Sequence, residues 1–331
     1  MGMELSAPLV GVGILQAVLY VLFVRFVDLY EREPLMYVLP VFVWGFTVAV
    51  VVSLVFNTLF SLTISAVASA QAATFLTSVV GAPVIEESAK GLALLITFGV
   101  AYGVSRRRGA IEFSGVMDGI VYGSAVGFGF AIAEDLLYYA QFGPETFVVR
   151  RVFGGFAHAA FASLTGIGIG LIPWVRHGIS KFTVPLLGLA GAIGLHALFN
   201  LTATLFGPLA YGVMLIVVLL YVALIVVWLA AERRIIRSEL RDEVGDETIS
   251  QGDYELLPTY FRRKSYYLGL ILGGRFSEWR AARSAHSTAV DLAFTKRLSR
   301  NSRAAPQSIR ERRLRQKLRD TRNAPAAKPA S

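Results

Sequence analysis

Seven long apolar stretches dominate the sequence and limit what it can fold into. Each is long enough to cross the hydrocarbon core of a bilayer, which takes about 20 apolar residues in a helix. Backbone polar groups inside a bilayer must be satisfied within the protein, so such stretches become membrane-spanning helices. We place the spans at residues 9–27, 35–60, 73–104, 115–140, 152–175, 182–206 and 209–230. The sequence therefore predicts an all-α, polytopic transmembrane helix bundle.

The composition agrees with a membrane protein and separates off its C-terminal end. Hydrophobic residues make up 55% of the chain and charged residues 17%, against about 25% charged in an ordinary soluble domain. Residues 232–331 hold 22 of the 32 Lys and Arg and 12 of the 23 Asp and Glu, which makes this tail net +10 and leaves the first 231 residues net −1. We therefore expect a transmembrane domain over residues 1–231 and a basic cytoplasmic tail over 232–331.

The tail itself carries two further signals. An amphipathic stretch at residues 260–272 could lie on the membrane, and from Ser299 onward the composition predicts mostly disordered chain with a basic helix near 309–319. Basic residues near an anionic membrane surface gain about 1 kcal/mol each, so anionic lipids are the expected partner. We expect no nucleic-acid partner, because the tail carries no recognisable nucleic-acid-binding fold.

Two features of the sequence exclude other classes of protein. The chain contains no cysteine, which rules out disulfides, thiolate metal ligands and a cysteine nucleophile. The first apolar stretch has no basic residues before it and no small-residue cleavage site after it, so we expect a retained helix rather than a signal peptide.

The loops between the spans predict the orientation, since Lys and Arg accumulate on the cytoplasmic side. Alternate loops carry Arg32, Arg106 to Arg108, Arg176 with Lys181, and the basic tail, and only Arg150 and Arg151 break the pattern. We expect a multi-pass protein of the plasma membrane with its N-terminus outside and its C-terminus in the cytoplasm.

Several spans carry side chains that a lipid-facing helix would not tolerate. An ionisable group inside a bilayer costs from a few to more than ten kcal/mol unless something pairs with it, which makes such residues functional-site candidates. The candidates for catalysis are Glu86, Glu87, Glu134, His158, His196 and Asn200. Lys90 lies four residues after Glu86, at the spacing of a neutralising pair, which leaves Glu87 without an obvious local partner. Asp135 is expected at the membrane interface.

The depth and the faces of these residues predict that they meet. At about 1.5 Å of rise per residue, Glu134, His158 and His196 all lie roughly 9–15 Å below the outer surface. Pro83 is a natural first-turn residue and would bring Glu86 to a similar level. Small residues at every fourth position mark the side of a helix that faces another helix. One such row contains His158 and Gly166, and another contains His196 and Asn200. A third row, the glycines at 115, 119, 123 and 127, runs toward Glu134.

The chemistry that suits such a group is amide hydrolysis, which needs a base to take a proton from water and donors for the oxyanion. In one version Glu87 or Glu134 is the base and no metal takes part. In the other, Glu134, His158 and His196 hold a zinc ion with one position open for water, and a second glutamate is the base. The spacing differs from the H-E-x-x-H motif, so this metal site would be assembled from separate helices.

Four short motifs resemble those of the PrsW family of intramembrane proteases, which are relatives of the CAAX-prenyl endopeptidases and bacteriocin-immunity membrane proteins. Residues 84–90, VIEESAK, resemble the family's E-E-x-x-K signature, and residues 130–134 resemble F-x-x-x-E, with Asp135 where the family usually has Asn. His158 and its successors resemble the third motif, and His196 to Asn200 the H-x-x-x-N motif. The match covers about residues 80–205, with the motifs in the expected order.

The resemblance implies a protease that cleaves a membrane-anchored protein, such as an anti-sigma factor, at the extracytoplasmic side. By position, Glu86 and Glu87 become the base and its supporting carboxylate, Glu134 and His158 the water or metal binders, and His196 with Asn200 the oxyanion or metal-side partners. The two alternatives are an ion- or proton-coupled transporter and a non-catalytic binding or immunity-type protein. No internal repeat is evident, and the polar residues gather toward one side of the membrane, which favours the protease.

Overall fold

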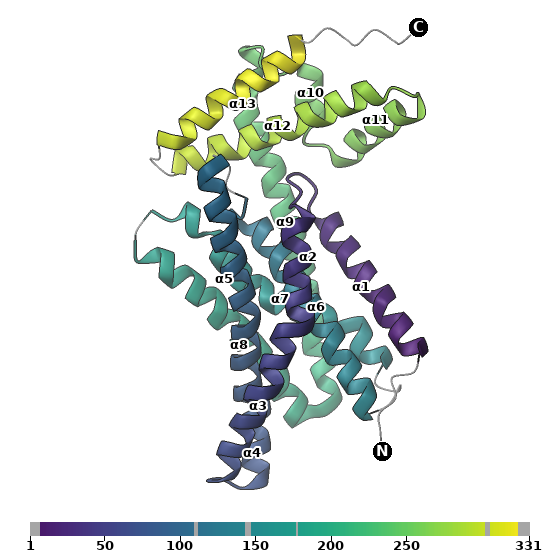
Figure 1. Cartoon of the computed structure of the whole chain (residues 1–331), viewed down its shortest axis with the longest axis vertical. Helices are drawn as coiled ribbons and strands as arrows, with labels where there is room; N and C mark the ends of the chain where they lie inside the picture. Colours follow the sequence, from purple (N-terminus) through teal and green to yellow (C-terminus); the bar gives the residue numbers. More distant parts are fainter. Residues whose placement is uncertain (1–6, 109–111, 143–146, 177, 302–304, 324–331) are drawn as a thin grey trace. The chain divides into compact units, whose positions relative to one another are not determined.

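The computed structural model describes residues 7–108, 112–142, 147–176, 178–301 and 305–323, and within these ranges every regular element is helical (Figure 1). No strand occurs in the described ranges, which confirms the predicted all-α class. The chain divides into two compact units. The first unit comprises Met1–Asp28, Glu33–Ser105 and Ile111–Val226, and the second comprises Leu29–Arg32, Arg106–Ala110 and Val227–Ser331.

The first unit is a bundle of long helices. Their bounds are α1 Ala7–Val27, α2 Leu35–Trp44, α3 Val50–Ser65, α4 Ala70–Leu76, α5 Ala82–Arg108, α6 Val116–Phe142, α7 Phe147–Gly170, α8 Ser180–Phe206 and the first half of α9 Ala210–Gly245. Two π-helical turns, Gly45–Ala49 and Thr77–Gly81, join α2 to α3 and α4 to α5. Pro83 lies just after the π-helical turn Thr77–Gly81, and the helix runs on from α4 into α5 without a break, so Pro83 does not begin the helix as the sequence suggested.

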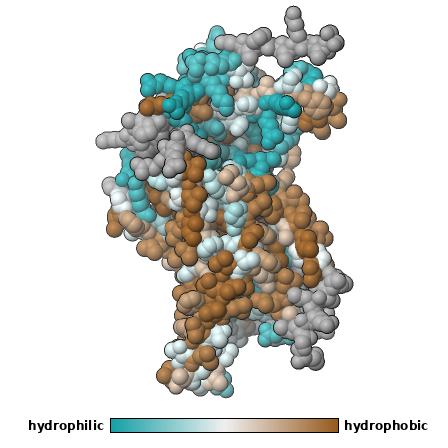
Figure 2. All heavy atoms as spheres, viewed as in Figure 1, coloured by the Kyte–Doolittle hydropathy of each residue, from teal (hydrophilic) through white to brown (hydrophobic). Residues whose placement is uncertain are grey.

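Five stretches of the described chain are long and apolar enough to cross a membrane: Val10–Val27, Leu35–Ser65, Val116–Gln141, Gly154–Trp174 and Ser180–Gly245. The last contains two helices, α8 and α9, joined by the turn Gly207–Leu209. Helix α5, with Glu86, Glu87 and Lys90, is not among the five. The first unit exposes many large apolar side chains, as Figure 2 shows by its broad brown surface. The chain is a multi-pass membrane protein.

Glycines bring α6 and α7 into backbone contact at the centre of the first unit. A Cβ added at Gly119 would lie 2.5 Å from the backbone of Gly166, and one at Gly127 would lie 2.4 Å from the carbonyl oxygen of His158. Small residues at every fourth position allow this approach, so the predicted glycine packing is confirmed. Every residue of α6 from Val116 to Ala133 is buried, and this helix therefore forms the core on which the site is built.

The second unit is built from the end of α9 with α10 Gln251–Leu256, α11 Tyr260–Leu272, α12 Phe276–Asn301 and α13 Ala305–Asn323. Its core consists of buried aliphatic residues on α9, α12 and α13, among them Ile236, Leu240, Leu292 and Leu318. The expected helices at 260–272 and near 309–319 are confirmed. The expectation of mostly disordered chain after Ser299 is wrong over 305–323, because Leu314 and Leu318 pack α13 onto this core. Residues 302–304 and 324–331 lie outside the described residues.

Candidate active site

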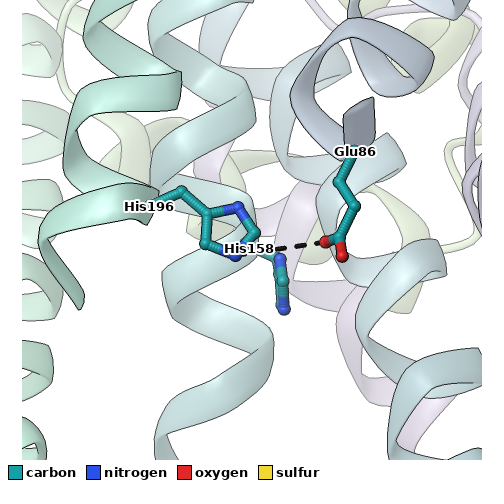
Figure 3. A group of neighbouring side chains, drawn as sticks. All are labelled: Glu86, His158 and His196. Carbon is teal, nitrogen blue, oxygen red and sulfur yellow. Dashed lines mark ion pairs between the residues drawn. The ribbon is translucent and has the colours of Figure 1, made fainter. Parts of the chain in front are cut away.

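Four helices of the first unit place polar side chains in one buried group. Helix α5 supplies Glu86, Glu87 and Lys90, α6 supplies Glu134, α7 supplies His158, and α8 supplies His196. Figure 3 shows Glu86, His158 and His196 pointing toward one another from three of these helices, with an ion pair between His196 and Glu86. The predicted meeting of carboxylates and imidazoles from separate spans is confirmed.

Lys90 is the link between α5 and α7. Its Nζ donates a hydrogen bond to Glu87 Oε1 at 2.7 Å and lies 3.0 Å from His158 Nδ1, but 3.8 Å from Glu86 Oε2. The ammonium also sits 3.9 Å from the centre of the Phe130 ring, in cation–π contact. Lys90 thus pairs with both glutamates, and its predicted pairing with Glu86 is the longer contact. Glu87 was expected to have no local partner, but it makes the closer contact with Lys90.

Each imidazole is held by a carboxylate through one ring nitrogen. His158 Nε2 lies 2.9 Å from Glu134 Oε2, and His196 Nδ1 lies 2.9 Å from Glu87 Oε1. In the neutral rings these nitrogens carry the proton and donate, which leaves a lone pair on the other nitrogen of each ring. The second nitrogens face inward, His158 Nδ1 toward Lys90 and His196 Nε2 toward Glu86 Oε2 at 4.0 Å.

Most of the group is buried, and its three carboxylates, Glu86, Glu87 and Glu134, accompany one ammonium, that of Lys90. Glu87 and Lys90 are 0% exposed and Glu86 is 7% exposed, whereas the Glu134 side chain keeps 21% of its surface. The Oε2 atoms of Glu86 and Glu87 have no hydrogen-bond partner within the described chain. Buried, unsatisfied carboxylate oxygens are costly, so the group calls for a further cation or donor.

Glu86, His158 and His196 have the arrangement of a metal site. One ligand atom of each lies within 4.8 Å of the others, and all three residues are buried. Two histidines and a glutamate are a common catalytic zinc shell, and histidine ligands usually donate their other N–H to a carboxylate, as these do. The unsatisfied Oε2 of Glu86 also fits a metal. The sequence predicted Glu134 as the third ligand of this metal site, but in the structure Glu86 takes that place. Glu134 instead contacts Nε2 of His158.

Two other polar residues of the spans, Asn200 and Asp135, make contacts of their own. Asn200, one turn after His196 on α8, donates from Nδ2 to the carbonyl oxygen of Ser78 at 2.8 Å, so it holds α8 to the π-helical turn that precedes α5. Asp135, expected at the interface, is 0% exposed. Its Oδ1 faces α7 beside Gly154.

Sequence reasoning missed one polar neighbour of the group. Asn57, on α3, donates from Nδ2 to Glu86 Oε1 at 3.5 Å. The signal was present, because an amide inside an apolar span is itself a candidate for an internal contact. Phe161 was also missed. Its ring stacks on His196 with centroids 5.1 Å apart and limits the rotation of the imidazole.

Comparisons with known proteins agree with these observations. The family model described as "PrsW family intramembrane metalloprotease" matches residues 33–229. The chain is 30% identical over 188 residues to a protein named "Protease PrsW" from Geobacillus kaustophilus (strain HTA426), covering 52% of this chain and 77% of that relative. It is 30% identical over 145 residues to "Protease PrsW" from Shouchella clausii (strain KSM-K16), covering 44% and 61%. No solved structure matches the chain.

Proposed function

The chain belongs to the PrsW family of intramembrane metalloproteases, and from this we propose that it hydrolyses a peptide bond of a membrane-anchored protein at the group formed by Glu86, His158 and His196. The observation that carries the proposal is the pairing of both imidazoles. A carboxylate holds one nitrogen of each ring, and one ligand atom of each imidazole lies within 4.8 Å of the other and of a Glu86 oxygen. Packing alone would not require such an arrangement.

Glu86, His158 and His196 would hold the metal, and zinc is the ion we propose. When bound, the metal supplies Lewis-acid polarisation of the scissile carbonyl and a water that ionises near neutral pH. Lys90 Nζ lies 3.0 Å from His158 Nδ1, so the proposal requires this ammonium to shift onto Glu87, which it already contacts at 2.7 Å. Glu87 then balances Lys90 and orients His196.

We assign the role of proton acceptor to Glu134. Its side chain is the most exposed carboxylate of the group, at 21%, so water can reach it, while Glu87 Oε1 already accepts from Lys90 and His196. A general base must lie within hydrogen-bond reach of the water it activates. Asn200 acts as a positioning residue through Ser78, and its predicted part in oxyanion binding remains a prediction.

We further propose the membrane setting of the reaction. The distribution of Lys and Arg in the loops favours an external N-terminus and a cytoplasmic C-terminus in the plasma membrane, which places the Glu/His group toward the extracytoplasmic side. The substrate would then be a membrane-anchored protein cut near that side, as for an anti-sigma-factor-type substrate.

The test compares cleavage and metal content in the full-length protein. Purified protein in proteoliposomes is incubated with tagged single-span substrates, and bound metal is measured by elemental analysis. We expect Glu134→Gln to lower cleavage by about 10²–10⁴-fold, the usual worth of a general base, with metal content unchanged. His196→Ala should lose both metal and cleavage.

The control is Glu278→Gln in the second unit, an exposed residue of α12 paired with Arg275. This variant should cleave like the native protein. Normal cleavage in His196→Ala would remove the site assignment, and normal cleavage in Glu134→Gln alone would move the base to another residue. Zinc-free protein that cleaves at the native rate would exclude the metal version.

A further inference from the structure

Helix α11 of the second unit has two faces with different surroundings. At 3.6 residues per turn, Arg263, Tyr267 and Leu270 fall on one side within about 60° of arc. Arg263 and Leu270 are 6% and 3% exposed. Arg263 donates to the carbonyl oxygens of Leu257 and Leu29, and the Tyr267 hydroxyl lies 2.7 Å from His286 Nδ1. This side fixes the helix to its own unit and cannot turn outward without breaking these bonds.

The opposite side of α11 is apolar and uncovered. Phe261, Ser265, Leu268 and Leu272 follow at spacings of four, three and four, again within about 60°. Phe261 is 76% exposed, Leu268 54% and Leu272 78%. After the turn at Gly273 and Gly274, the first residue of α12, Phe276, is 53% exposed. We refer to Phe261, Leu268, Leu272 and Phe276 as the α11 patch. Figure 2 shows hydrophobic atoms gathered over α11, whereas much of the rest of that unit is hydrophilic.

Basic residues border the α11 patch on both sides. Around the helix axis, Arg262 lies about 90° to one side of the apolar face and Lys264 about 70° to the other. Residues 260–283 contain six Lys or Arg and a single acidic residue, Glu278. An apolar face flanked by cationic side chains is the pattern of a helix that lies in a membrane interface, with its apolar side among the acyl chains and its cations at the headgroups.

We propose that the α11 patch inserts into the interface of an anionic membrane. Charge decides between this occupant and a second copy of the chain. Arg263 is buried on the other side and Arg275 pairs with Glu278, so two copies would bring the remaining basic residues, Arg262, Lys264, Arg280 and Arg283, against their counterparts, whereas anionic headgroups complement them. Chain connectivity supports the same choice. Helix α9 is unbroken from Ala210 to Gly245, so the second unit follows directly from an apolar helix that is long enough to span the bilayer. The proposal is independent of the proteolytic mechanism.

The absence of cysteine from the sequence allows a direct test. Full-length Leu268→Cys is labelled with an environment-sensitive fluorophore and placed in nanodiscs of phosphatidylcholine with phosphatidylglycerol. We expect acyl-chain-attached quenchers to quench the label and aqueous iodide to leave it unaffected. In phosphatidylcholine alone the acyl-chain quenching should fall, because each basic residue near an anionic surface strengthens attachment about fivefold.

Matched variants separate insertion from simple attraction of charge. Gln316→Cys, an exposed position of the strongly basic helix α13, should stay accessible to iodide in both lipids. Adding Leu272→Glu to the Leu268→Cys protein should abolish acyl-chain quenching, and this residue is too exposed for the change to unfold the unit. Adding Arg262→Glu and Arg280→Glu should remove the dependence on phosphatidylglycerol.

Two outcomes would overturn the proposal. One is a Leu268 label that iodide quenches as readily as the Gln316 label in anionic nanodiscs. The other is protection of the label that depends on protein density and appears together with crosslinking between Leu268→Cys chains, since this would make a second copy the occupant. A native melting temperature for each variant confirms that the comparison is made on folded protein.

Discussion

Both units bury a network of charged side chains, and the two networks are balanced differently. In the second unit, Glu239 pairs with Arg297 and Arg300, and Glu243 pairs with Lys296 at 2.7 Å and Arg315 at 2.8 Å. Both glutamate side chains are at most 1% exposed, and each has two cations. In the buried group of the first unit, Glu87 and Glu86 face Lys90 at 2.7 and 3.8 Å, and Glu134 lies against His158 at 2.9 Å. Glu239 Oε2, like Glu86 Oε2, has no hydrogen-bond partner in the described chain, but two arginines lie within 3.7 Å of the Glu239 carboxylate. A carboxylate with two cations holds helices together, whereas one with no close cation retains capacity to bind a cation or a proton.

The apolar residues around the two charged networks also differ. Around Glu243 the neighbours are aliphatic side chains of α9, α12 and α13, which bury their apolar surface inside the unit. On the helices that carry the site, a small apolar cluster is formed by Ala49, Val50, Ala89, Phe130 and Ala133, and α6 and α7 approach through glycines. In the second unit the charges therefore support a core, and in the first unit the helix packing supports the charges. Four substitutions test this contrast.

The largest effect should come from Glu86→Gln, which keeps the shape of the side chain and removes a charge. Because Glu86 Oε2 has no hydrogen-bond partner in the described chain, we expect the thermal stability to stay level or rise. Cleavage should fall by about 10³-fold, equivalent to roughly 4 kcal/mol of transition-state stabilisation. Proteoliposome cleavage and a melting curve measure the two quantities. A Glu86→Gln protein with a lowered melting temperature and native cleavage would contradict this, because it would give the first network a structural role and not a catalytic one.

For Glu243→Gln we expect the opposite result, a loss of stability with cleavage unchanged. Removing one partner of a buried ion pair costs about 3–5 kcal/mol, and this change leaves Lys296 without its carboxylate and Arg315 with Glu311 alone, at 3.6 Å. We expect early unfolding of the second unit, seen as faster hydrogen exchange in α12 and α13, with cleavage by the folded protein unchanged. Glu247→Gln, whose side chain is 83% exposed against Arg322, is the control and should cost less than about 1 kcal/mol. Equal losses in both variants would contradict the contrast.

Much of the first unit could be predicted because the rise and rotation per residue of a membrane helix are nearly constant. Rise per residue and helical angle were enough to bring Glu134, His158 and His196 together, although they come from three helices. The choice between Glu86 and Glu87 as the partner of Lys90 could not be predicted. Spacings of three and four are both allowed on one helix, and the neighbours from other helices, His158 and His196, decide it.

The second unit was harder to predict because its apolar residues are few and far apart. Leu314 and Leu318 lie one turn apart in an otherwise polar and basic stretch, and their partners on α9 and α12 are distant in sequence. Local composition therefore indicated disorder. The pairing of Arg315 with Glu243 crosses 72 residues, and no local pattern encodes it. Long-range ion pairs and a small core fold a segment that its composition alone would leave unstructured.

A smaller effect should follow from Gly127→Ala, which tests whether helix packing supports the charges of the first unit. The added Cβ would lie 2.4 Å from the carbonyl oxygen of His158 and 2.6 Å from the amide nitrogen of Ala159. Backbone atoms cannot move aside cheaply, so we expect about 1–3 kcal/mol of destabilisation and cleavage lowered by about 10²-fold through displacement of His158. Gly99→Ala, with nothing within 4 Å of the added atom, should leave both unchanged. Equal behaviour of the two variants would show that α6 and α7 can separate without loss.

The smallest effect concerns a third charged contact, between Asp253 and His286 in the second unit. His286 Nε2 lies 2.9 Å from Asp253 Oδ1, and this hydrogen bond holds the pKa of Asp253 below its usual range. A carboxyl group whose pKa is lowered by folding contributes stability above its unfolded pKa and loses it as the pH falls through the folded value. Native α10 and α12 should therefore exchange amide hydrogens faster, relative to the intrinsic rate, as the pH falls below about 4. In Asp253→Asn this acid-dependent part should disappear, while the acid response set by Glu243 persists. An unchanged pH profile in the variant would mean that the Asp253 contact, with its side chain 44% exposed, is too well solvated to stabilise the unit.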